Sequence, residues 1–265
     1  MNRIKRELQV APWEHCEVEL PQAVLDVDLK LAQDAENADL WMERGLALAK
    51  AALYRESVEA YSRAIAIDPF RGIFYRHRGH RLISCWRFEE ACADFAIAAR
   101  LIPDNWDVWY HYGLAYFLLR DYKNALRIYE QCYAISNTEE KLIAITDWLW
   151  ITLNRLGEKE RAAEYLDKIS PDFDPGENGS YFMRLLLYKG LKSPEELLPS
   201  NAKDIVVRTI TMGFGLSNYY DVMGDRKKSD EVIEMVIKAG DEMELHFAFG
   251  YLAAKVDKTF RALKR

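Results

Sequence analysis

Residues 72–105 read GIFYRHRGHRLISCWRFEEACADFAIAARLIPDN, and the same residue types recur when this stretch is laid over Ala38–Arg71 and over Trp106–Glu139. A fixed period of this kind, 34 residues here, indicates stacked supersecondary units and carries more weight than any local motif. The matching positions are Trp41, Tyr75 and Trp109; Gly45, Gly79 and Gly113; Tyr54, Phe88 and Tyr122; Ser57, Ala91 and Ala125; Tyr61, Phe95 and Tyr129; Ala64, Ala98 and Cys132; Ile67, Leu101 and Ile135; and Pro69, Pro103 and Asn137.

Within one copy, the apolar residues fall at helical spacing in two runs separated by a short polar turn, which contains Asp121 in the third copy. The repeated glycine costs about 1 kcal/mol of helix propensity relative to alanine, so its recurrence suggests a steric need for close approach of the second helix. We expect the alanine of the second helix to face it and the later aromatic residue to fill the space towards the next pair. Pro69 and Pro103 cannot continue a helix and end their units. The sequence therefore predicts pairs of helices that bury their apolar faces only by stacking.

These three copies resemble tetratricopeptide repeats, because aromatic, glycine, alanine, aromatic, alanine and proline residues all fall at the spacing of that family. The resemblance is clear over about 100 residues. It departs at Ser57, Cys132 and Asn137, and at Arg44 and Arg78, which stand where leucine is commoner. It implies an all-α fold, a right-handed α-solenoid of stacked antiparallel helix pairs, with no catalytic activity and no cofactor of its own.

Composition excludes several classes of function. The net charge of −6 and the pI of about 5.5 argue against general nucleic-acid binding, which needs a basic surface. The four cysteines have no metal-ligand spacing and favour a reducing compartment. Residues 1–16 contain no run of signal-peptide type, and no stretch approaches the roughly 20 apolar residues of a membrane helix. We therefore expect a cytoplasmic protein without a membrane or nucleic-acid partner.

Three regions follow from the repeat pattern. Residues 1–37 form an N-terminal segment and a capping helix over Gln22–Asn37, residues 38–139 hold the three clear repeats, and residues 140–265 hold degenerate helix pairs that continue the solenoid. Three inserted residues near Ser136–Leu142 precede a fourth repeat, and Pro171–Ser180 is the candidate linker.

Two further helix pairs and a terminal helix are expected after the linker. The pairs comprise residues 181–189 with 193–198, and 205–223 with 226–238. The last helix, about Glu242–Lys264, places its leucines and phenylalanines on one face and Lys255, Asp257, Lys258 and Arg261 on the other, as a terminal cap would.

The first helix of the second repeat is unusually basic. Five arginines (Arg71, Arg76, Arg78, Arg81 and Arg87) and two histidines occur there with no acidic residue before Glu89. In tetratricopeptide repeat proteins the first helix of each pair lines the concave groove. That resemblance implies a groove lined by Asp39, Met42, Glu43, Leu46, Lys50, Ile73, Arg76, His77, His80, Ser84, Asp107, Tyr110, His111, Leu114, Phe117 and Leu118.

We expect a partner peptide, with an acidic residue and a bulky anchor, to bind this groove. Arg76, His77 and His80 would provide polar contacts, while Tyr110, Leu114 and Phe117, with His111 beside them, would provide the anchor site. Alternatively, the same charges form a face balanced by neighbouring acids, with Arg78 paired to Glu43, Asp94 or another acid.

Two other functions stay open. The groove could be filled by Met1–Leu20, with Trp13 as the plug, or by a second copy of the chain in a homodimer. The histidines His77, His80 and His111 could instead hold a small anion or a metal, although the zinc-type ligand set is incomplete. Binding of chaperone C-terminal tails is rejected, because the positions that hold the tail carboxylate in one subfamily are occupied by Met42, Leu46, His77, Asp107 and His111.

Overall fold

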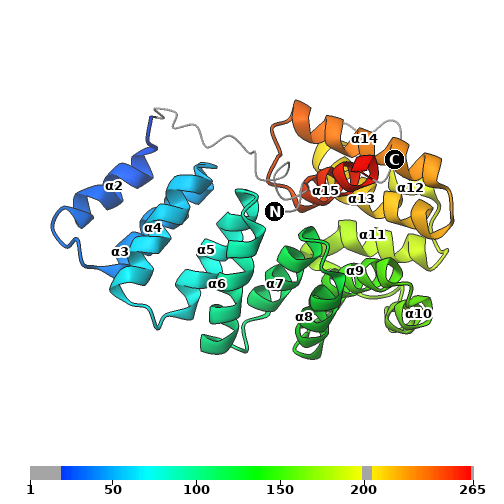
Figure 1. The fold of residues 1–265 in the computed structure, drawn as a ribbon, viewed down its shortest axis with the longest axis horizontal. Helices are drawn as coiled ribbons and strands as arrows, with labels where there is room; N and C mark the ends of the chain where they lie inside the picture. Colours follow the sequence, from blue (N-terminus) through cyan, green and yellow to red (C-terminus); the bar gives the residue numbers. More distant parts are fainter. Residues whose placement is uncertain (1–18, 199–204, 264–265) are drawn as a thin grey trace. The chain divides into compact units, whose positions relative to one another are not determined.

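The computed structural model describes residues 19–198 and 205–263, in which every regular element is helical (Figure 1). The predicted plugging of the groove by Met1–Leu20, with Trp13, falls on residues that lie almost entirely outside these ranges. The helices are α2 (Gln22–Leu31), α3 (Ala38–Lys50), α4 (Tyr54–Ile67), α5 (Gly72–Ser84), α6 (Phe88–Leu101), α7 (Trp106–Leu118), α8 (Tyr122–Ala134), α9 (Glu139–Leu156), α10 (Lys159–Asp167), the 3-10 turn η1 (Gly176–Asn178), α11 (Gly179–Tyr188), α12 (Pro194–Leu197), α13 (Ile205–Val222), α14 (Arg226–Glu242) and α15 (Phe249–Leu263).

The chain divides into two compact units between Leu119 and Arg120. In the N-terminal unit, consecutive helices from α2 to α7 pack against one another; in the C-terminal unit, α8 to α15 form a second set of neighbouring helices. The predicted fold class, an all-α stack of helix pairs, is confirmed. No described helix is both long and apolar enough to cross a membrane.

The repeated glycine faces an aromatic ring of its own helix pair. A Cβ atom on Gly45 would lie 2.5 Å from the Tyr61 ring, and one on Gly79 would lie 3.0 Å from the Phe95 ring. We expected the small residue of the second helix to face the glycine, and Ser57 does so by donating a hydrogen bond of 2.7 Å to the Gly45 carbonyl. The aromatic ring, however, fills the glycine notch instead of pointing only towards the next pair. The glycine is therefore needed because the ring occupies the place of its side chain.

The turn inside each helix pair uses one left-handed residue. Ala52, Trp86 and Arg120 have φ values of 60°, 62° and 60° and are 34 positions apart. In the later pairs, glycine takes this place at Gly157, Gly190 and Gly224, with φ values of 82°, 71° and 81°. The spacing of those three glycines was a weak sign that the period persists, and their shared conformation gives it a physical cause.

The C-terminal unit contains a buried ion pair where the repeat pattern fades. Asp147 of α9 lies 2.7 Å from the guanidinium of Arg184 in α11, and both side chains have almost no exposed surface. The arginine passes directly over Gly215 of α13, where a Cβ would come within 2.1 Å of Nε. Three helices that are distant in sequence are thus fitted around one charged side chain.

Three sequence expectations need correction. Residues 171–180 are not a free linker, because backbone N–H groups of Asp174 and Glu177 donate to the Glu139 and Glu140 carboxylates at the start of α9. The first helix ends at Leu31 and not near Asn37, since the chain turns there.

The last helix begins at Phe249 and its charged side is not all solvent-facing. Asp257 and Arg261 are buried, 2 % and 8 % exposed. Asp257 accepts from Arg120 at 2.6 Å and pairs with Arg155, while Arg261 contacts Asp221 and Asp230. These partners explain why a charged helix face is buried here.

Candidate functional site: the first-helix face of the N-terminal unit

Two ion pairs join the first helices of successive pairs. Arg71, the N-cap of α5, lies 2.8 Å from Asp39 of α3, and Arg76 of α5 lies 2.9 Å from Asp107 of α7. Each contact spans about one repeat along the chain. The surface made by α3, α5 and α7, hereafter the first-helix face, is thus a row of helices bridged by charge pairs.

Arg76 is half-buried and fully engaged. Its side chain is 16 % exposed, whereas that of Asp107 is 49 % exposed. One nitrogen donates to Asp107 and another donates to Nδ1 of His77 at 3.1 Å. The charge predicted to meet an acidic partner is therefore already balanced by an acid of the chain itself.

The histidines of this face are neutral near pH 7. Burial lowers the pKa of His77 to about 4, helped by the positive charges of Arg76 and Arg81, and its ring stacks on Tyr61 with centroids 5.5 Å apart. Burial likewise lowers the pKa of His111 to about 4, and that of His80 well below its usual value. The expectation of a positively charged imidazole cluster is corrected: the imidazoles contribute ring contacts and hydrogen bonds.

His80 and His111 lie against each other, with ring centroids 4.3 Å apart. Nδ1 of His111 donates to the Asp107 carbonyl at 2.6 Å, because that oxygen can only accept. Within the described residues no three metal-ligating side chains gather to hold an ion, so the metal version of the third hypothesis finds no support there.

The apolar members of the predicted site are buried. Tyr110 is 6 % exposed, Phe117 3 % and Leu114 not at all, and Tyr110 stacks on Trp106 at 4.7 Å. Their contact with a partner stays a prediction. On α3, by contrast, Leu46 is 42 % exposed and Met42 is half-buried, so the accessible apolar surface of this face lies beside the first repeat.

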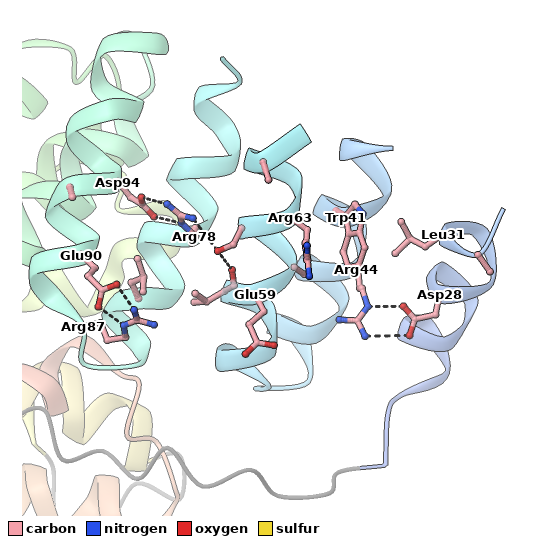
Figure 2. A pocket seen from close by; sticks show the side chains of 17 residues that line it. Asp28, Leu31, Trp41, Arg44, Glu59, Arg63, Arg78, Arg87, Glu90 and Asp94 are labelled. Carbon is pink, nitrogen blue, oxygen red and sulfur yellow. Dashed lines mark hydrogen bonds and ion pairs between the residues drawn. The ribbon is translucent and has the colours of Figure 1, made fainter. Parts of the chain in front are cut away.

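The other side of the same helix pairs carries a hollow of about 1060 Å³ (Figure 2). Second helices α2, α4 and α6 line it, with single side chains from α3 and α5. Sequence reasoning missed this hollow, because its charged residues come from four helix-turn segments that share no motif. Its labelled lining residues in Figure 2 are Asp28, Leu31, Trp41, Arg44, Glu59, Arg63, Arg78, Arg87, Glu90 and Asp94.

Most charges in this hollow are paired. Arg78 makes two bonds of 2.7 Å to Asp94, the pairing that the sequence left as one alternative, and a third bond of 3.0 Å to Ser62. Arg44 binds Asp28 in the same way one repeat earlier, at 2.6 Å. The two arginines in the usual leucine position therefore tie neighbouring second helices together.

Comparisons with known proteins agree with this architecture. Family models described as tetratricopeptide repeat match residues 38–71 and 87–140. The basic stretch 72–86, which includes α5, lies between the two matches.

A curated relative is the heat-shock protein cognate co-chaperone sgt12 of Aspergillus fumigatus, 30 % identical over 78 residues. The similarity covers 29 % of this chain and only 23 % of the relative.

Two kinds of solved structure share the fold. MamA is 15 % identical with a TM-score of 0.52, covering 64 % of this chain and 90 % of its own. YrrB, described as a TPR protein with an unusual peptide-binding site, is 16 % identical with a TM-score of 0.51, covering 89 % of this chain and all of its own. With the 34-residue period, the glycine–aromatic contacts and these matches together, the chain is a tetratricopeptide repeat protein.

Proposed function

We propose that this protein is an interaction scaffold that binds a partner protein on the first-helix face of its N-terminal unit, without catalysis of its own. The observation that carries the proposal is the chemistry of α3 and α5 at one place. Leu46 and Met42 offer accessible apolar surface, and beside them lie the half-buried His77 and the Arg76–Asp107 pair. A mixed surface of this kind suits a peptide that brings one bulky side chain and polar groups around it.

The relatives support an interaction role in general terms. One is named a co-chaperone, and another is described by its peptide-binding site. We propose a partner other than a chaperone tail, because Asp107 places an exposed carboxylate where the tail-binding subfamily has a basic residue. His80, Tyr110, His111, Leu114 and Phe117 then support the contact surface from below, and partner contact by any of them requires local opening of α7.

Affinity purification with quantitative mass spectrometry tests this proposal. Leu46→Glu and Arg76→Glu alter the first-helix face, and Arg63→Glu, an exposed residue on α4 in the opposite hollow, is the matched control. Partners that are retained by the wild type and by Arg63→Glu, but lost from the first two variants, are expected. Equal recovery by all four proteins would refute the proposed surface, and circular dichroism checks that each variant is folded.

A further inference from the structure

Arg81 differs from the other four arginines of the basic stretch. Arg71, Arg76, Arg78 and Arg87 each pair with an acid: Asp39, Asp107, Asp94 and Glu90. Across the ranges that the structure describes, no carboxylate pairs with Arg81. Its guanidinium lies over the ring of Tyr54, 5.0 Å from the ring centroid.

The surroundings of Arg81 contain no negative charge that would compensate it. The titratable groups that act on it are the phenols of Tyr54 and Tyr61, the thiol of Cys85 and the guanidinium of Arg76. Burial raises the pKa of Cys85 to about 11 and also raises the pKa values of both tyrosines, so all three are neutral at pH 7. A half-buried guanidinium among neutral groups and a second cation loses hydration without an ionic partner in return. In agreement, burial lowers the pKa of Arg81 below its usual value.

Helix packing does not require an arginine at this position. The equivalent residues one repeat earlier and one repeat later, at the 34-residue spacing, are Ala47 and Ala115. The stretch 72–86 that contains Arg81 is also the part of the three repeats that neither family match includes. A large cation at an alanine position, in the helix that departs most from the repeat pattern, indicates a role outside the fold.

We propose that Arg81 is the anion-binding residue of the first-helix face and takes a side-chain carboxylate of an aspartate or glutamate in the partner. The planar guanidinium accepts a carboxylate through two parallel N–H···O bonds, which fixes orientation as well as charge. Arg76 is already engaged by Asp107, so the positive character that the basic helix offers to a ligand is concentrated at Arg81. This inference rests on the proposed function of the same face and names the partner's chemistry.

The first test observes the side chain in the full-length protein. In ¹H–¹⁵N spectra of the arginine Nε–Hε groups, with Arg81→Lys used for assignment, sodium acetate is titrated at constant ionic strength. The Arg81 signal is expected to shift and saturate, while those of Arg76 and Arg78 move little because their ion pairs persist. A shift at Arg81 no larger than at those two would overturn the proposal. Inorganic phosphate forms the second arm, and binding tenfold tighter than acetate would replace the carboxylate with a phosphoryl group.

The second test uses the partner recovered by the purification above. Arg81→Ala is expected to weaken its binding by about tenfold to a hundredfold, as for loss of a charge-assisted hydrogen bond, with Arg81→Lys retaining part of the affinity. If the partner depends on Leu46 but binds Arg81→Ala as tightly as the wild type, the carboxylate site fails while the proposed function stands. If no partner depends on Leu46 or Arg76, the proposed function itself fails.

A thermal scan of Arg81→Ala separates binding from folding. Because the change removes an uncompensated charge and restores the alanine of the neighbouring repeats, an equal or higher melting temperature is expected. A large fall in melting temperature would show that Arg81 has a structural role and would refute the proposal.

Discussion

The two units hold similar helices together by different means. In the N-terminal unit, the contacts recur: a glycine takes the aromatic ring of its partner helix, and an arginine in the leucine position binds the neighbouring second helix. In the C-terminal unit, α9 and α11 are joined by the single ion pair of Asp147 and Arg184, which has no counterpart 34 residues away. Steric fit can be copied from repeat to repeat, whereas a buried charge pair specifies one arrangement of one set of helices.

The strongest way to break this comparison is to remove one member of the buried pair. Asp147→Ala leaves the Arg184 charge buried without its partner and is expected to cost about 3–5 kcal/mol of unfolding free energy. Urea unfolding followed by tryptophan fluorescence measures the change. The double variant Asp147→Leu with Arg184→Met is the control, and recovery of most of the loss would show that the lone charge is the cause. A loss below about 1 kcal/mol for Asp147→Ala would contradict the assigned role.

The same pair gives the protein a pH dependence. Burial raises the pKa of Asp147 to about 7, since lost hydration outweighs the attraction of Arg184, while the carboxyl has its ordinary value near 4 in the unfolded chain. Between these values the folded state binds the extra proton, so this group's contribution falls as pH rises from about 4 to about 7, by at most about 4 kcal/mol, and is flat above.

Asp147→Asn isolates this contribution. The wild type should lose stability relative to that variant across the interval from about pH 4 to about pH 7 when both are unfolded in urea at several pH values. A stability difference that does not change with pH would mean that Asp147 is ionised throughout.

The recurring steric contact is tested by adding one methyl group. Gly45→Ala forces the new Cβ against the Tyr61 ring and is expected to destabilise the protein by about 1–3 kcal/mol, even though alanine is the better helix former. Gly79→Ala should cost less, because the closest approach to Phe95 is 3.0 Å instead of 2.5 Å. In a Tyr61→Leu background the penalty of Gly45→Ala should shrink, and equal penalties in both backgrounds would show that the ring is not the cause.

The recurring arginine contacts should differ with burial. Asp94→Ala removes a carboxylate that is 5 % exposed and leaves Arg78 half-buried, which should cost about 1–3 kcal/mol. Asp28→Ala removes the equivalent partner of Arg44, whose own side chain is 35 % exposed, and should cost less than about 1 kcal/mol. Thermal unfolding of both variants gives the ratio, and a larger effect at Asp28 would reverse the ranking.

The smallest effects concern the left-handed turn that both units share. Ala52→Gly should stabilise by about 0.5–1 kcal/mol, because glycine adopts φ 60° without strain. Gly157→Ala should destabilise by a similar amount for purely conformational reasons, since nothing lies within 4 Å of the added Cβ. Changes of the same sign at the two positions would show that backbone conformation does not decide these turns.

The sequence predicts most of the N-terminal unit because its contacts follow a period. Glycines, aromatics and helix ends all repeat, so one copy informs the others. The burial of Asp257 could not be predicted in this way. Helical periodicity assigns charged residues to solvent, and its partner Arg120 is 137 residues earlier in the chain. The candidate site shows the same limit, since the run of arginines is visible in the sequence but the acid that neutralises each one is set by packing.

The turn at Ala52, Trp86 and Arg120 has a consequence for how such a chain changes over time. Each hairpin closes on an identical joint, and that joint tolerates alanine, tryptophan and arginine in turn. Duplication or loss of a 34-residue module then leaves the joints on either side unchanged. A single hairpin such as the one containing Arg81 is free to acquire new surface chemistry while its neighbours keep the scaffold intact.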